Sequence, residues 1–179
     1  MKDNGAFLLL ASNRPEAIDQ ALLRNGRCDF KIKLNRPSME SVQLILRHHL
    51  GRVPIGEDTS LDELVMYATE SIADPSRIIL EAAAIDWDGK RLKARKGSTR
   101  AFTFENILSG AMVVSIPERA KRLAFVRDRD SGKFTGVSVQ DILDAVNAVY
   151  QENLLIDHTY ALNEFKKEYE EWISSSSKE

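Results

Sequence analysis

The sequence predicts a predominantly α-helical fold that begins with a short α/β segment and continues as a helical bundle. Residues 6–11 form a continuous apolar run of strand length, which is typical of a strand covered on both faces. From Ser38 onward the apolar residues recur at helical spacing instead. The change of period therefore separates a strand-bearing segment from a helical one.

Length and composition allow an ordinary globular protein. The chain has 179 residues, of which 43% are apolar and 29% are charged, and its net charge is -2. Such a charge gives no general attraction to nucleic acid or to an anionic membrane. The single cysteine, Cys28, excludes an intramolecular disulfide and suits a reducing compartment. Residues 6–11 are too few to span a bilayer, so we expect a cytoplasmic protein without membrane contact.

The segment before residue 38 is expected to hold two strands and a short helix. Polar residues 12–15 end the strand predicted at residues 6–11, and residues 17–23 fit a helix of about two turns. Residues 31–34 alternate polar with apolar side chains and precede Pro37. This alternation predicts a second short strand.

The first two helices of the bundle have clear start signals. Ser38 can cap a helix that ends at Gly51. Ser60 and Glu63 have the spacing of a capping box, in which each side chain satisfies an amide of the other residue. We therefore expect one helix after Ser38 and a second one after Ser60.

Two further helices are predicted between residues 74 and 116. Asp74 followed by Pro75 is a strong helix start, because the acid accepts free amides and proline has none to lose. This third helix is expected to run to about residue 88. Thr103 can cap a fourth helix, which we expect to end before Pro117.

Two connecting segments have distinct compositions. Residues 89–100 are strongly basic, and no aromatic residue lies between the charges to stack on a base. A solvated loop is therefore favoured over a nucleic-acid or peptide contact. Residues 126–136 include Asp-Ser-Gly-Lys, which predicts a turn, with a short hairpin as one possibility.

The C-terminal part predicts two more helices. Residues 138–150 and 159–173 both show apolar residues at helical spacing. The second stripe is mainly aromatic and consists of Leu162, Phe165, Tyr169 and Trp172. Packing on the preceding helix is favoured over docking of a partner. Residues 174–179 are polar, and we expect them to be disordered.

The residues that suggest chemistry follow the first predicted strand. Asn13 would lie at the end of a buried strand, where ligands of open parallel sheets commonly bind. Arg24 and Arg27 follow, and forked guanidinium donors neutralise charge that develops in phosphoryl transfer. A local salt bridge to Asp19 or Asp29 is the alternative role for either arginine.

Residues 12–30 closely resemble the second region of homology of AAA ATPases. The family pattern is Thr-Asn-Arg-Pro, then Leu/Ile-Asp-x-Ala-Leu-x-Arg, then x-Gly-Arg-Phe-Asp-Arg. This chain has Ser-Asn-Arg-Pro, Ile-Asp-Gln-Ala-Leu-Leu-Arg and Asn-Gly-Arg-Cys-Asp-Phe in the same order. The resemblance implies that Asn13 is the sensor-1 residue. It also implies that Arg24 and Arg27 are arginine fingers that reach the nucleotide of a neighbouring subunit.

A second match lies about fifty residues downstream. Residues 71–83 read Ser-Ile-Ala-Asp-Pro-Ser-Arg-Ile-Ile-Leu-Glu-Ala-Ala and resemble the lid signature Ser-Gly-Ala-Asp-Ile-x-x-Leu-x-x-Glu-Ala-Ala. In the family the Gly-Ala pair lies against the adenine base, which implies that Ile72 and Ala73 bind the cofactor. Ile72 replaces the glycine of the signature. A capped amphipathic helix is the alternative interpretation.

The sequence lacks the motifs that grip a nucleotide. A P-loop requires Gly-x-x-x-x-Gly-Lys-Ser/Thr, whereas Gly89-Lys90 and Gly132-Lys133 lack both the earlier glycine and the following hydroxyl. We therefore expect the chain to be a fragment whose P-loop lies upstream of Met1. ATP and Mg²⁺ would be bound mainly by parts absent from this chain.

No metal site of the chain's own is predicted. His48 and His49 are adjacent on a helix and therefore point about 100° apart. His158 is remote in the sequence. Surface positions are the favoured interpretation of all three.

The resemblance implies an α/β remnant of a P-loop AAA core followed by a helical lid. The expected domains are the end of the core, the lid, a C-terminal helical extension and the tail, at residues 1–37, 38–116, 117–173 and 174–179. The parent would be a homo-oligomer, expected as a hexameric ring, that couples ATP hydrolysis to remodelling of a protein substrate. This chain alone would be inactive. The alternative is a non-catalytic helical adaptor derived from a AAA scaffold.

Overall fold

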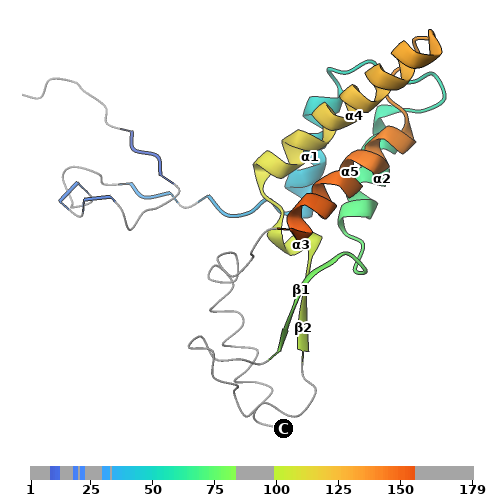
Figure 1. The fold of residues 1–179 in the computed structure, drawn as a ribbon. Coiled ribbons are helices and arrows are strands. Elements are labelled where there is room, and N and C mark those ends of the chain that lie inside the picture. Colours follow the sequence, from blue (N-terminus) through green and yellow to red (C-terminus); the bar gives the residue numbers. More distant parts are fainter. Residues whose placement is uncertain are drawn as a thin grey trace, which may run out of the picture. The chain divides into compact units, whose positions relative to one another are not determined.

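The computed structural model describes residues 9–12, 18–19, 21–22, 30–32, 34–83 and 99–155. The chain divides into two units, Met1–Asn35 and Arg36–Glu179. The described part of the second unit is mostly helical and carries one small sheet (Figure 1). The predominantly α-helical class predicted from the sequence is thereby confirmed.

The described residues of the first unit form a turn but no strand or helix. The amide of Leu22 donates to the Asp19 carbonyl at 2.9 Å, and the amide of Ala21 donates to Asp19 Oδ1 at 2.8 Å. The strands predicted at 6–11 and 31–34 are wrong for their described residues. A strand is stable only when hydrogen-bonded neighbours satisfy its backbone, and the described residues of this unit supply none. The remaining positions of both strands and of the predicted helix lie outside the described residues.

Four helices pack together in the second unit: α1 (Met39–Leu50), α2 (Leu61–Ile72), α4 (Gly110–Ser131) and α5 (Val139–Leu154). Contacts join α1 to α2, α2 to α5, α5 to α4, and α4 to α1. The four helices therefore enclose one core. Figure 1 shows them lying side by side.

The caps predicted for α1 and α2 are confirmed. Ser38 Oγ accepts a hydrogen bond from the Ser41 amide at 3.2 Å, and Gly51 follows the last residue of α1. At α2 the Glu63 amide donates to Ser60 Oγ at 3.2 Å, while the Ser60 amide donates to Glu63 Oε2 at 2.8 Å. Both ends of this capping box are therefore satisfied.

The predicted third helix is wrong, because its described residues form a turn followed by a strand. Strand β1 (Ile78–Ala83) pairs antiparallel with β2 (Thr99–Thr103), with Ala83 opposite Thr99. Asp74 Oδ1 accepts from the amide and hydroxyl of Ser76 at 2.8 and 2.7 Å. These bonds reach only two residues onward and form a turn, so Asp74 does not start a helix. Residues 84–88 lie outside the described part.

The predicted fourth helix is divided into two. Helix α3 (Phe104–Ile107) follows Thr103 as predicted, but Ser109 then caps α4 by accepting from the Met112 amide at 3.3 Å. The helical conformation is interrupted at Leu108, whose extended backbone ends α3.

Helix α4 also continues through Pro117 to Ser131, so the predicted end before Pro117 is wrong. Proline lacks an amide and loses the bond to the carbonyl four residues earlier. Buried residues on both sides of it, Val113 and Ala120 among them, pack into the core and offset this loss. The turn predicted within residues 126–136 is found only at Gly132, because residues 126–131 are helical. Gly132 has a φ of 67° and ends α4.

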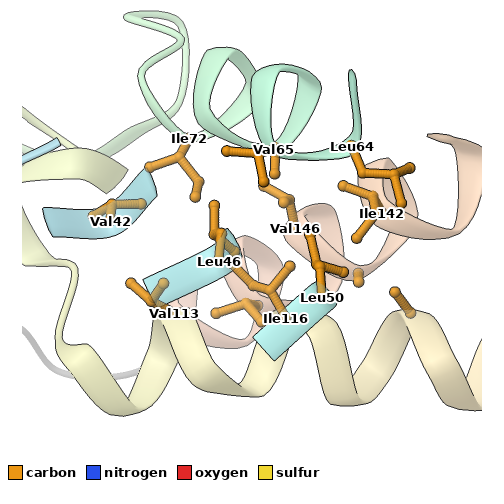
Figure 2. Close-up of a cluster of buried hydrophobic side chains, with 14 of the residues drawn as sticks. Val42, Leu46, Leu50, Leu64, Val65, Ile72, Val113, Ile116, Ile142 and Val146 are labelled. Atoms are coloured by element: carbon orange, nitrogen blue, oxygen red, sulfur yellow. The ribbon is translucent and has the colours of Figure 1, made fainter. Parts of the chain in front are cut away.

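The core consists of apolar side chains from all four packed helices. Its fully buried members include Val42, Leu46, Leu50, Leu64, Ile72, Val113, Ile116, Ile142 and Val146, which Figure 2 shows facing one another. This core corresponds to the apolar stripes expected for α1, α2 and α5. The helix predicted at 138–150 is confirmed as α5, whereas the one at 159–173 and the tail lie outside the described residues.

Two connectors meet at one end of the bundle. Ile55, between α1 and α2, forms a parallel bridge with Val137, between α4 and α5. Gly136 has a φ of 73°, and a Cβ there would lie 2.8 Å from the carbonyl carbon of Ile55. Only glycine fits this close approach of two backbones.

Candidate functional site

The three residues predicted to act on the nucleotide phosphates lie outside the described residues. Asn13, Arg24 and Arg27 belong to the first unit, and their roles stay predictions. The same holds for the alternative salt bridges of the two arginines.

The predicted adenine-binding pair lies at the C-terminal end of α2. Ile72 is the last residue of the helix, and its side chain is 0% exposed within the core. Ala73 follows as the C-cap; its amide donates to the Thr69 carbonyl at 2.9 Å, and its side chain is exposed. Of the two residues, only Ala73 therefore presents its side chain to a ligand. The contact with adenine stays a prediction.

The order Ser-Gly-Ala also occurs at residues 109–111, and sequence reasoning missed it. Here the glycine of the lid signature is present, which was the signal that could have identified it. Ser109 caps α4, Gly110 is its first residue, and Ala111 is exposed. A Cβ at Gly110 would meet no heavy atom within 4 Å. The start of α4 therefore has an open surface beside its glycine.

Arg77 joins the base of the hairpin to two helices. Its guanidinium donates to Ser71 Oγ at 2.9 Å and to Asn147 Oδ1 at 3.3 Å, and it lies 5.0 Å above the ring of Tyr150. The Tyr150 hydroxyl donates to the Ile78 carbonyl at 3.1 Å. These contacts fasten the first strand to α2 and α5.

A polar network holds the loop between α4 and α5 at the opposite end of α5. Asp128 accepts from the amides of Thr135 and Gly136 at 2.9 and 3.2 Å. Arg127 pairs with both Asp128 and Asp141. The Thr135 hydroxyl and amide, the Gly136 amide and Arg127 together lower the pKa of Asp128 to about 2. The same carboxylates raise the pKa of Arg127.

The network predicts a loss of stability in acid. Because the folded-state pKa of Asp128 is lowered from 3.8 to about 2, its carboxylate stabilises the fold above about pH 4, and this contribution disappears as the pH falls through about 2. We expect Asp128→Asn to lower the melting temperature at pH 7 and to flatten its decline between those two pH values. Thermal unfolding followed by circular dichroism measures both. An Asp130→Asn control, at an exposed residue, should retain the wild-type decline.

A metal site and a membrane span are both missing from the part of the chain that the structure describes. No three His, Cys, Asp or Glu side chains there lie close enough together to hold a metal ion. None of the described helices combines the length and the apolar character needed to cross a bilayer.

Comparisons with known proteins identify the helical part. Residues 89–169 match the family described as "ARC, AAA+ ATPase lid domain". An "AAA ATPase forming ring-shaped complexes" from Corynebacterium diphtheriae is 30% identical over 151 residues, which are 84% of this chain and 27% of the relative. A "Proteasome-associated ATPase" from Saccharopolyspora erythraea is 33% identical over 147 residues, or 80% of this chain and 24% of the relative.

The chain spans about a quarter of the length of these curated relatives. The matched region includes the hairpin strand β2 and helices α3, α4 and α5, together with the Ser-Gly-Ala sequence that opens α4. The resemblance to the C-terminal part of a AAA ATPase is thereby confirmed, because residues 89–169 match the lid domain of ARC-type AAA+ ATPases.

Proposed function

We propose that this chain is the C-terminal portion of a ring-forming AAA ATPase that couples ATP hydrolysis to remodelling or unfolding of proteins. The observation that carries the proposal is the helical lid, whose residues 89–169 match the ARC family. The ordered motif in residues 12–30 supports it. So do the relatives, one of which is described as forming ring-shaped complexes and another as proteasome-associated.

In the proposed mechanism, Asn13 and the two arginines act on different nucleotides at a subunit interface. Asn13 acts in its own subunit, where an amide can orient a water or bind the terminal phosphate. Arg24 and Arg27 act on the nucleotide of the next subunit, with a hexamer as the expected ring. ATP supplies the transferable phosphoryl group and Mg²⁺ neutralises its charge, and both are held mainly by residues that this chain lacks. The chain alone is then inert.

The lid contributes the surface for the adenine base. Gly110 and Ala111 are better placed for this contact than Ile72. The side chain of Ile72 is buried in the core, whereas the position of a Cβ at Gly110 is open space. A flat base needs close approach to the backbone, which a residue without a Cβ permits. The Ser-Gly-Ala order of the lid signature at 109–111 supports this placement.

A mixing experiment tests the proposal. The purified 179-residue chain is titrated with a fluorescent ATP analogue, first alone and then mixed with an upstream fragment that carries a P-loop. We expect little binding alone and ATP hydrolysis on mixing. Tight binding of the analogue by the chain alone would contradict the proposal that the nucleotide is held mainly by residues outside this chain. Failure to bind or hydrolyse in the mixture would favour the helical adaptor.

Substitution at Gly110 separates the two candidate adenine contacts. Gly110→Val adds a branched side chain in open space, so folding should persist while nucleotide affinity of the mixture falls about tenfold, or about 1.4 kcal/mol. Ala73→Val is the matched change at the exposed residue of the other candidate. The analogue titration reports both affinities. A loss of nucleotide affinity with Ala73→Val and none with Gly110→Val would instead assign the adenine contact to residues 72–73.

A further inference from the structure

A cavity of about 550 Å³ opens where the two connectors meet. Its wall is largely apolar and includes Val53, Pro54, Ala124 and Val137. Phe125 on α4 and Phe134 in the α4–α5 loop also line it, with exposed fractions of 66% and 82%. Two phenylalanines this exposed beside an apolar cavity mark a binding surface. We call the cavity and its two phenylalanines the connector groove.

The rim of the connector groove is basic. Lys121, Arg129 and Lys133 line it. The one acid among the lining residues, Asp128, is buried and paired with Arg127, so the exposed charge of the rim is positive. Lys121 and Arg129 each pair with a nearby surface acid on α4, at 2.6 and 2.9 Å, and such exposed pairs exchange partners at little cost. Lys133 forms no ion pair among the described residues. An occupant should therefore combine large apolar side chains with acidic neighbours.

Residues 159–173 of this chain have that composition. In a helix, Leu162, Phe165, Tyr169 and Trp172 would form one stripe. Three acids, Glu164, Glu168 and Glu171, would form a second stripe beside it. We propose that residues 159–173 occupy the connector groove of their own chain, with the aromatic stripe in the cavity and the glutamates at the basic rim.

The length of the segment permits this placement. The groove lies at the N-terminal end of α5, whereas the described chain ends at Leu155, one helix length of about 24 Å away. Residues 159–173 as a helix would span about 22 Å. After a turn at residues 156–158, the segment can therefore run back along the bundle to the level of the groove.

The emission of Trp172 tests the proposal in the full chain. The chain has two tryptophans, so Trp87→Phe leaves Trp172 as the only reporter. We expect Trp172 to be shielded from acrylamide. Phe125→Asp should increase its quenching severalfold, because the change removes an apolar contact and places an acid beside the glutamates. Leu123→Asp is the matched control, since Leu123 is also a partly exposed apolar residue of α4 but does not line the groove.

Charge reversal provides an independent readout. Reversing the rim with Lys121→Glu, Arg129→Glu and Lys133→Glu should also expose Trp172, and changing Glu164, Glu168 and Glu171 to lysine in that variant should restore the shielding. Circular dichroism verifies that each variant keeps its helices. Equal quenching in Phe125→Asp, Leu123→Asp and the parent would overturn the proposal. Shielding that grows with protein concentration would also overturn it, because the segment would then come from a second copy.

Discussion

Arg24→Ala is expected to lower the ATP hydrolysis rate of the reconstituted ring about 10³-fold or more, because an arginine finger contributes that much to phosphoryl transfer. The guanidinium would stabilise charge on the nucleotide of the neighbouring subunit, so nucleotide binding should change much less than turnover. The measurement is the steady-state rate of phosphate release with the upstream fragment present. Native mass spectrometry of the same sample shows whether the ring still assembles.

Arg122→Ala is the matched control for the finger. Arg122 is an exposed arginine on α4, and its loss should leave the rate within about twofold of the parent, as expected of a surface change. Full hydrolysis by the Arg24→Ala ring would refute the finger assignment. The same decrease in both variants would indicate a general loss of charge or solubility.

Phe104→Ala is expected to have the largest effect on stability, destabilising the bundle by about 3–5 kcal/mol. Phe104 is 0% exposed, and its ring meets that of Tyr150 edge-on at a centroid distance of 5.7 Å. Truncation leaves a cavity and removes an aromatic pair at the junction of β2 and α3. Urea unfolding followed by circular dichroism gives the change in free energy of unfolding.

Phe125→Ala offers a comparison at a phenylalanine that is 66% exposed. Its effect on stability should be clearly smaller than that of Phe104→Ala, because Phe125 lines the connector groove and is not a member of the core. A cost at Phe104 no larger than the cost at Phe125 would show that the junction is not part of the cooperative unit.

The starts of α1, α2, α3 and α5 were predictable because their causes are local. Ser38 and Ser60 each accept from an amide three residues onward in the structure, as predicted from the sequence. Ser138 accepts the same kind of bond at the start of α5, where the sequence predicted the helix but not its cap. Thr103 likewise precedes a helix. Capping uses atoms within one turn, so a short window of sequence contains the necessary information.

Strand β1 and the length of α4 were not predictable by the same means. Residues 78–83 have apolar side chains that suit either a helix or a strand, and the pairing with β2 decides between them. Pro117 suggested a helix end, but packing on both sides of it carries α4 onward. In both cases contacts distant in sequence outweigh the local preference.

The candidate site also has features that the sequence could predict and features that it could not. The sequence by itself indicated the family, because residues 12–30 preserve an ordered set of chemical groups, and it located the starts of α1, α2, α3 and α5. Only the tertiary structure decided that Ile72 belongs to the core and that Gly110 lies beside open space. Burial depends on which elements pack against a residue, and that packing is set by the whole chain.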